Sequence, residues 1–153
     1  MNNPDLAQAL LSPQSIALIG ASADETKTGG RPLRYLLRHG YAGKIYPVNP
    51  RVKKIGDLDC YPDLASIPDS VDHAFIMLSE DAALAAVQAC SAAKIPCATI
   101  LAGGFAEAGE SGADLQEKLL QAGRDGNVRL LGPNSIGMIN PVTGATLSAN
   151  ALL

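Results

Sequence analysis

The residues Ser15-Ile-Ala-Leu-Ile-Gly-Ala-Ser22 decide the fold of this chain. Their first part, Ser15–Ile19, is a short apolar run, and Gly20 follows it directly. Such a run is typical of a strand that is buried on both faces, as the strands of a parallel sheet are. A loop rich in Gly, Ser and Thr comes next, and Pro32 is favourable as the first residue of a helix. The stretch therefore predicts a buried strand, a glycine-containing loop and a helix.

The same alternation continues along the chain. Short apolar runs predict further strands at Lys44–Val48, His73–Leu78, Cys97–Leu101 and Asn127–Leu131. Helical patterns predict helices at Leu6–Leu11, Leu33–Arg38, Ala82–Ala93 and Ala113–Ala122, the last of them closed by Gly123. Strands and helices that alternate in steps of about 25–30 residues are typical of a parallel sheet covered on both faces. We predict an α/β fold, a Rossmann-like doubly wound parallel sheet, as a single domain over residues 1–153.

The composition excludes several classes of protein. With 153 residues, 47% hydrophobic and 18% charged, the chain has what a packed core needs. A net charge of -3 argues against a nucleic-acid partner, and no apolar run approaches the roughly 20 residues of a membrane span. Met1–Asp5 has no signal-peptide pattern, and the three cysteines are unpatterned. We therefore predict reduced thiols, no metal site and a cytoplasmic protein.

Basic residues gather in the first third of the chain. Residues 1–54 hold eight of the twelve Lys and Arg residues but only three of the fifteen acids. This imbalance favours a positive face that attracts a small anion, and a chance scatter of surface charge is the alternative. In doubly wound sheets the ligand lies beyond the carboxyl ends of the strands, so candidate binding residues are expected there.

The loop after the first strand offers groups for an anion. Gly20 permits a sharp turn, Ser22 brings a hydroxyl close to the next helix N-terminus, where phosphate is favoured, and Lys27 adds charge. The loop has neither the Gly-x-Gly-x-x-Gly pattern of dinucleotide-binding proteins nor the Gly-Lys-Ser/Thr of a P-loop. A plain strand–helix connection is therefore the alternative interpretation.

The end of the second strand is more specific. NAD-binding domains place Asp or Glu there to hold the ribose hydroxyls, but this chain has Val48-Asn49-Pro50 followed by Arg51, Lys53 and Lys54. A basic turn in the place of the acid disfavours NAD. It favours a ligand with an extra phosphate on or near the ribose, namely NADP or coenzyme A. A solvated basic turn is the alternative.

No catalytic residue is predicted. None of the strand ends carries a nucleophile beside a base. His73 opens a strand and is expected to have a surface or packed role rather than a catalytic one, Cys97 is expected in the core, and Glu107 is expected to be a solvated loop acid. Ser135 either contacts a ligand or closes a turn.

Four strings together resemble a known family. Ser15-Ile-Ala-Leu-Ile-Gly-Ala-Ser22, Ile45-Tyr-Pro-Val-Asn-Pro50, Gly103-Gly-Phe-Ala-Glu107 and Leu131-Gly-Pro-Asn134 resemble the coenzyme A-binding domain of ADP-forming acyl-CoA synthetases. They are more distantly similar to the alpha subunit of succinyl-CoA synthetase. The resemblance covers roughly Leu11 to Met138 in the family's order, and four motifs in register are more specific than any one of them.

The resemblance implies coenzyme A as the ligand. By motif match, Gly20, Ala21 and Ser22 meet its phosphates, Asn49 and Pro50 border the nucleotide, and Arg51 or Lys53 holds phosphate. Ser79 and Gly103, at the next strand ends, line the remainder. In the family, acyl transfer passes through a phosphorylated histidine on a later domain, with ATP bound by an ATP-grasp domain. This chain has neither, so the resemblance implies the binding module of an acid–thiol ligase without a complete active site.

Two alternatives stay open. Modules of this type also occur in protein lysine acetyltransferases, which implies a regulatory module that senses CoA or acyl-CoA, or a stand-alone CoA-binding protein. The second alternative is a fragment of an NADP-dependent oxidoreductase. It is the weaker one, because no Tyr, Lys or His pair is placed to manage the proton that accompanies a hydride.

Overall fold

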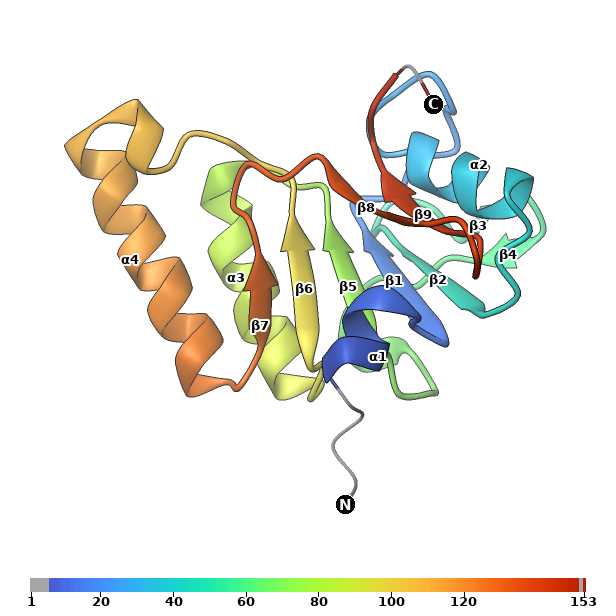
Figure 1. Ribbon diagram of the computed structural model, residues 1–153, viewed down its shortest axis with the longest axis horizontal. Coiled ribbons are helices and arrows are strands. Elements are labelled where there is room, and N and C mark those ends of the chain that lie inside the picture. The colour runs from blue at the N-terminus through green and yellow to red at the C-terminus, as the bar shows by residue number, and fades with distance from the viewer. Residues whose placement is uncertain (1–5, 152) are drawn as a thin grey trace.

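A five-stranded parallel sheet forms the centre of the computed structural model, which describes residues 6–151 and 153 (Figure 1). The stretch Met1–Asp5, from which we predict the absence of a signal peptide, lies outside the described residues. Going across the sheet, the strands are β2 (Lys44–Val48), β1 (Ser15–Ile19), β5 (His73–Ile76), β6 (Cys97–Ile100) and β7 (Arg129–Leu131). Every neighbouring pair is parallel.

The strand order contains one reversal. The chain runs outward from β1 to β2, then returns past β1 to β5 and continues to β7 at the far edge. The reversal lies between β1 and β5, where Ala17 pairs with Ala74 on one side and with Tyr46 on the other. This is the topology of a doubly wound, Rossmann-like sheet, so the predicted fold class is confirmed.

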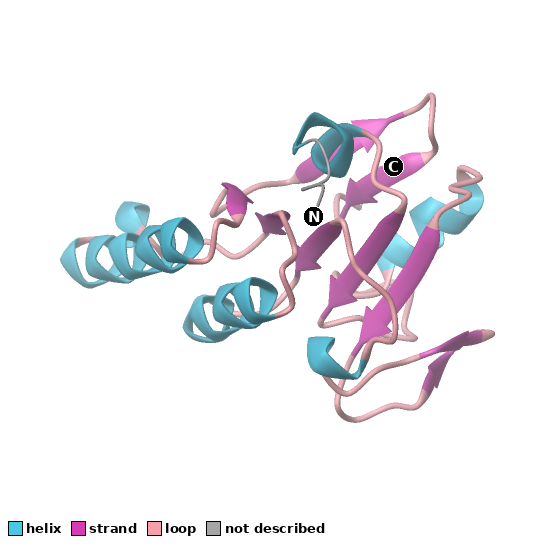
Figure 2. Cartoon of the chain, turned by 90° about the horizontal axis from the view of Figure 1, so that it is seen from below, coloured by secondary structure: helices cyan, strands magenta, loops and turns pink. Residues whose placement is uncertain are grey.

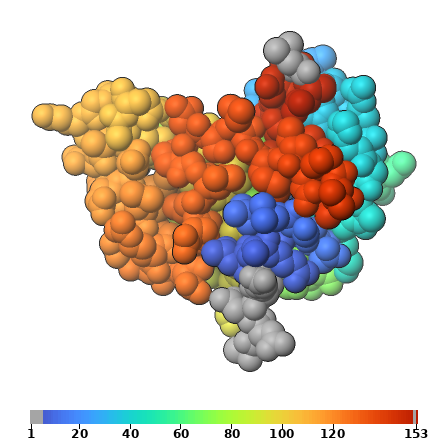
Figure 3. Space-filling model, viewed as in Figure 1, coloured from blue at the N-terminus to red at the C-terminus, as the bar shows by residue number. Residues whose placement is uncertain are grey.

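Both faces of the sheet are covered. Alternate strand residues such as Ala17 and Ile76 pack toward α3 (Glu80–Ala92) and α4 (Glu110–Asp125). Ile16 and Phe75 point the other way, toward the side that carries three further elements: α1 (Leu6–Leu11), α2 (Arg31–Arg38) and the hairpin of β8 (Gly137–Asn140) and β9 (Ala145–Ser148). Figure 2 shows α1 and this hairpin on one side of the sheet and α3 on the other. The space-filling view in Figure 3 shows the surface of α1 and the hairpin side by side over their face.

Two hairpins lie where no strand is predicted. The second hairpin pairs β3 (Lys54–Ile55) with β4 (Leu58–Asp59), and a 3-10 helix, η1 (Leu64–Ser66), follows it; a further 3-10 helix, η2 (Ala106–Ala108), precedes α4. Together the second hairpin and η1 replace a crossover helix between β2 and β5. Strands of two residues are too short to show the alternation by which strands are recognised in a sequence.

The predicted end of the last helix is wrong. We expect the helix to close at Gly123, but α4 continues to Asp125 and Gly123 is buried inside it. A Cβ atom at Gly123 would lie 2.9 Å from Leu130 Cδ1. The glycine therefore lets α4 approach the edge strand closely, and the chain leaves the helix through Asn127, whose φ of 51° is left-handed. Among the described residues no helix is long and apolar enough to cross a membrane.

Candidate functional site

A cleft of about 490 Å³ opens at the carboxyl ends of β1 and β2. Ligands of doubly wound sheets are expected beyond the carboxyl ends of the strands, and the cleft also reaches the reversal of strand order, because Leu78, which follows β5, lines it. The cleft lies between these strand ends, the helix α3 and the segment that leads into η1. Its lining combines the predicted residues Gly20, Val48, Asn49, Pro50 and Arg51 with Ile19, Pro62, Asp63, Leu64, Leu78, Ala82, Ala85, Ala86 and Ala89.

The α3 wall of the cleft is built from alanines. Ala82, Ala85, Ala86 and Ala89 recur at the spacing that places residues on one helical face, and all four line the cleft. Leu64, the first residue of η1, also lines the cleft and is buried in the same apolar cluster as Ala86. Side chains this small leave a slot rather than a filled core. We did not predict this wall, although the alanine spacing within Glu80–Ala92 is visible in the sequence.

Asn49 joins the ends of β1 and β2. Its side-chain Nδ2 donates to the carbonyl oxygen of Ala21 at 2.8 Å, and its Oδ1 accepts from the backbone N–H of Arg51 at 2.9 Å. The backbone N–H groups of Gly20 and Ala21 both donate to the carbonyl oxygen of Val48, at 3.0 and 3.3 Å. One half-buried amide therefore fixes the first loop and the basic turn relative to each other.

Gly20 is required by the closeness of the next strand end. Its φ of 88° is left-handed, and a Cβ atom there would lie 2.9 Å from the carbonyl oxygen of Met77. Because of both features, any residue other than glycine at this position would destabilise the fold. The carboxyl ends of β1 and β5 therefore approach each other at the point where the strand order reverses.

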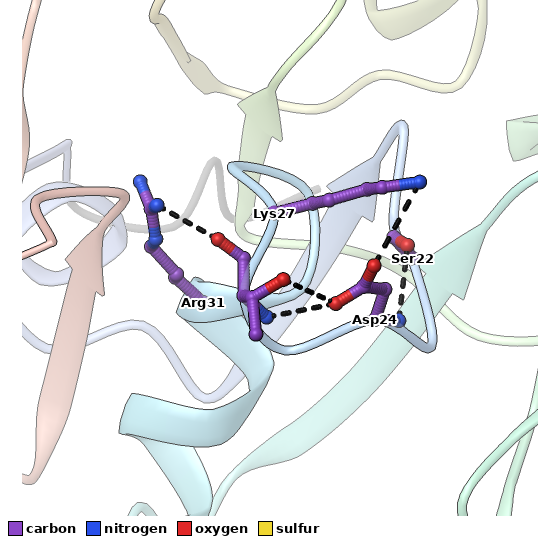
Figure 4. Close-up of polar contacts among 5 residues, drawn as sticks. Ser22, Asp24, Lys27 and Arg31 are labelled. Atoms are coloured by element: carbon purple, nitrogen blue, oxygen red, sulfur yellow. Dashed lines mark hydrogen bonds and ion pairs between the residues drawn. The ribbon is translucent and has the colours of Figure 1, made fainter.

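The loop over residues 20–30 is held by its own side chains, as Figure 4 shows. The Ser22 hydroxyl oxygen accepts from the backbone N–H of Asp24 at 3.1 Å, which leaves its O–H free to donate to a ligand. Hydrogen bonds from Thr26 to Asp24 Oδ1 hold the pKa of this exposed carboxyl below its usual value. Lys27 Nζ lies 3.7 Å from Asp24 Oδ2, so the predicted cation stands at the loop with an acid beside it.

Arg31 joins this loop to the segment that follows β9, and Figure 4 shows its contact within the loop. Its guanidinium donates to the carbonyl oxygen of Thr26 at 2.7 Å and to that of Ala149 at 3.1 Å. Tyr35, one turn further along α2, donates its O–H to the carbonyl oxygen of Asn150 at 2.6 Å. The Arg31 side chain therefore holds two segments of the fold together, whereas the side chain of Lys27 is exposed to solvent.

The basic turn comprises Arg51, Lys53 and Lys54, of which only Arg51 lines the cleft. Arg51 lines the cleft and is exposed. Lys53 and Lys54 are exposed on the β3–β4 segment, where Lys54 Nζ lies 3.5 Å from Asp59 Oδ1. Of the three cations, Arg51 is therefore best placed to meet a ligand in the cleft.

Ser79 and Gly103 stand at the neighbouring strand ends, outside the cleft lining. Ser79 is the exposed N-cap residue of α3, and Glu80 and Asp81 follow it in the first turn. Gly103 adjoins Glu107, whose Oε1 accepts from the backbone N–H of Gly104 at 2.7 Å. Hydrogen bonds from the loop backbone hold the pKa of Glu107 below its usual value. Acids at both positions make this part of the edge unsuitable for phosphate and suitable for an uncharged part of a ligand.

His73 is a core residue and does not line the cleft. It is fully buried, and its Nδ1 lies 3.1 Å from the carbonyl oxygen of Ala9, which can only accept, so Nδ1 carries the proton. Its Nε2 then accepts from the Thr99 hydroxyl at 2.8 Å. Cys97 is buried as expected, and the Ser135 hydroxyl closes a turn by accepting from the N–H of Gly137 at 3.1 Å. The described residues form no cluster of His, Cys, Asp and Glu that would hold a metal ion.

The fold and this edge define a Rossmann-like α/β domain, with a cleft beside the reversal of strand order and a basic residue at its rim. The family model described as "CoA binding domain" matches residues 14–141, and the chain belongs to that family. The resemblance read from the four sequence strings is thereby confirmed.

Curated relatives agree with this membership. The chain is 39% identical over 141 residues to acetate–CoA ligase (ADP-forming) II of Archaeoglobus fulgidus, covering 92% of this chain and 21% of the relative. It is 35% identical over 146 residues to the alpha subunit of acetate–CoA ligase (ADP-forming) I of Pyrococcus furiosus, covering 93% of this chain and 31% of that subunit. The chain thus spans between a fifth and a third of these relatives.

A solved structure has the same fold. The dinucleotide forming acetyl-coenzyme A synthetase 1 of Ca. Korarchaeum cryptofilum, in complex with phosphate and ADP, superposes with a TM-score of 0.89 at 34% identity. The match covers 95% of this chain and 31% of the synthetase. The whole of this fold therefore corresponds to a part of that synthetase that makes up about a third of its length.

Proposed function

We propose that this chain binds coenzyme A or acyl-CoA through its nucleotide and phosphate groups, as the CoA-binding module of an ADP-forming acyl-CoA synthetase. The observation that carries the proposal is Arg51 at the rim of the cleft, where a domain specific for NAD presents a carboxylate. A guanidinium there matches a phosphate on the ribose. The relatives, which are named acetate–CoA ligases, support the same ligand.

The cleft suits the parts of coenzyme A in a definite order. The flat base enters the apolar part of the cleft, which Leu64 and the alanines of α3 line. The ribose phosphate meets Arg51, with Lys53 nearby on the same turn. The diphosphate lies along the loop at Gly20–Ser22, where the Ser22 O–H donates and Lys27 supplies charge. The uncharged pantetheine arm follows the strand ends past Ser79 toward Gly103.

The chain supplies binding, and the ligation requires other domains. Neither histidine serves as a phosphate carrier in this proposal, because His73 is buried in the core and His39 follows α2 outside any matching motif. We therefore propose that ATP-grasp and phosphohistidine domains, on the same or another chain, act with this domain over residues 1–153. A cytoplasmic location belongs to the same proposal.

Calorimetric titration with coenzyme A, dephospho-CoA, NADP and NAD tests the proposal. A charge-assisted contact to the ribose phosphate contributes about 1.5–3 kcal/mol, so dephospho-CoA should bind about tenfold more weakly than coenzyme A or worse. Arg51→Gln should remove most of that difference. Lys118→Gln, which removes the same charge from an exposed position on α4, should leave it unchanged. Binding of NADP without coenzyme A would revive the oxidoreductase alternative, and binding of none of the four would contradict the proposal.

A further inference from the structure

Asp63 is the only carboxylate among the described residues that line the cleft. It is the N-cap residue of η1, and its Oδ1 accepts from both the backbone N–H and the hydroxyl of Ser66, at 2.8 and 2.7 Å. These two hydrogen bonds fix the plane of the carboxylate. Its Oδ2 has neither a hydrogen bond nor an ion pair to the part of the chain that the structure describes. An oriented acceptor therefore stands at the mouth of the cleft with one oxygen unused.

The charge of Asp63 decides which part of a ligand lies beside it. A carboxylate repels phosphate, so the phosphates belong at the other side of the cleft, with Arg51 and Gly20. The ribose carries those phosphates and is held on that side with them. The base is the part of the nucleotide that extends away from them, toward the apolar wall that begins at Leu64, the residue next to Asp63.

We propose that Asp63 is a specificity-determining residue, whose free carboxylate oxygen accepts a hydrogen bond from the exocyclic amino group of the adenine base. This inference rests on the proposed function and adds to it the residue that selects the base. Hypoxanthine and guanine carry a carbonyl oxygen at the same ring position. These bases carry their ring proton on N1, so a carboxylate on the N7 side of the ring would face that oxygen with no proton between them, and both acceptors would lose their contacts with water without gaining a bond.

A substitution at Asp63 can reverse this preference. Asp63→Asn keeps an oxygen that accepts from Ser66, and asparagine is as good an N-cap residue as aspartate. It also replaces the free oxygen with an NH₂ group, which donates to the carbonyl of hypoxanthine and repels the amino group of adenine. Asp63→Ser keeps a capping oxygen as well but has no second polar atom, so it should abolish the preference without reversing it.

The probes are adenosine 3′,5′-bisphosphate and inosine 3′,5′-bisphosphate, which carry the same phosphates and differ at this ring position. Titrations of the unmodified chain should show a preference for the adenine probe of about tenfold or more, the size of one hydrogen bond to a charged group. Asp63→Asn should favour the inosine probe, and Asp63→Ser should bind both about equally. Asp57→Asn, on the neighbouring hairpin and outside the cleft lining, is the matched control for the lost charge and should keep the original ratio.

The ratio of the two affinities separates this inference from the proposed function. Loss of a negative charge strengthens the binding of both bisphosphates alike, so only a change in the ratio supports a role for Asp63 in reading the base. An unchanged ratio in both Asp63 variants, with coenzyme A still bound, overturns the inference and leaves the proposed function standing. Failure of the unmodified chain to bind coenzyme A and both probes overturns the two together.

Discussion

Replacing Asn49 with alanine removes the side chain that joins the loop after β1 to the basic turn after β2. The change deletes two hydrogen bonds, from Nδ2 to the Ala21 carbonyl oxygen at 2.8 Å and from the Arg51 N–H to Oδ1 at 2.9 Å. Each contributes about 0.5–1.5 kcal/mol net, so the free energy of unfolding should fall by about 2 kcal/mol. Urea denaturation followed by circular dichroism measures that loss.

The same substitution should weaken coenzyme A binding beyond its effect on stability. Without the Asn49 amide, the first loop and the basic turn must be ordered relative to each other when the ligand binds, and that ordering opposes binding. We expect the affinity to fall about tenfold or more, since ordering costs of this kind amount to about 1.4 kcal/mol or more. Calorimetric titration of the folded variant gives the number.

Asn140 provides the control. Its Nδ2 donates to the Leu11 carbonyl oxygen at 2.7 Å and its Oδ1 accepts from the Val142 N–H at 3.0 Å, so it makes the same pair of bonds away from the cleft, with a longer contact of 3.4 Å from Nδ2 to Ser12 Oγ besides. Asn140→Ala should therefore cost about the same stability and leave the coenzyme A affinity unchanged. The reasoning is refuted if Asn49→Ala binds coenzyme A normally, or if both variants lose affinity equally.

Three further predictions follow from single positions. Gly20→Ala should destabilise the fold by about 1–3 kcal/mol because it combines a left-handed φ with a close backbone contact, whereas Gly40→Ala, with a φ of 71° and no atom within 4 Å of its Cβ, carries only the backbone cost; a comparison of their urea midpoints separates the two. Burial lowers the pKa of His73 to about 4, below the unfolded value of about 6.5. The neutral imidazole therefore adds about 3 kcal/mol to the free energy of unfolding above pH about 6.5, and this stabilisation is lost as the pH falls toward 4. Unfolding curves of His73→Asn should lack this part of the pH dependence. Burial raises the pKa of the Cys90 and Cys97 thiols to about 12, so a chromogenic disulfide reagent at pH about 8 should label them rapidly only after denaturation, and rapid labelling of the native chain would contradict their burial.

The main sheet could be predicted because its strands are short apolar runs, and the three inner strands, β1, β5 and β6, are buried along their whole length. The order of the strands was not predicted in detail, but alternation with helices limits the possibilities to a doubly wound sheet, and the reversal between β1 and β5 agrees with it. The hairpin over Lys54–Asp59 escaped prediction because its strands are two residues long. The predicted helix end at Gly123 was wrong because glycine can either end a helix or let another element pack closely against it. At Gly123 the second applies.

The part of the candidate site that the strand ends form could be predicted from the sequence, but the wall that α3 forms could not. Gly20, Asn49 and Arg51 follow strands directly, so the parallel topology alone brings them together at one edge. The opposite wall comes from residues whose side chains carry no chemistry, such as Ala86, and its position depends on how α3 packs. Asp63 precedes a single turn of 3-10 helix, and its place in the cleft becomes visible only with the path of the chain between β4 and β5.

Mapping the amide signals of the isotope-labelled chain by NMR during titration with adenosine 3′,5′-bisphosphate tests the central claim most directly. The claim is that the nucleotide of coenzyme A occupies the cleft between the ends of β1 and β2 and the helix α3. It predicts saturable shifts at Gly20–Ser22, at Asn49–Arg51 and at the α3 alanines that face the cleft, with α4 unaffected. Shifts confined to the far edge of the sheet, around Arg124 and Arg129, would contradict the claim, as would a spectrum that does not change.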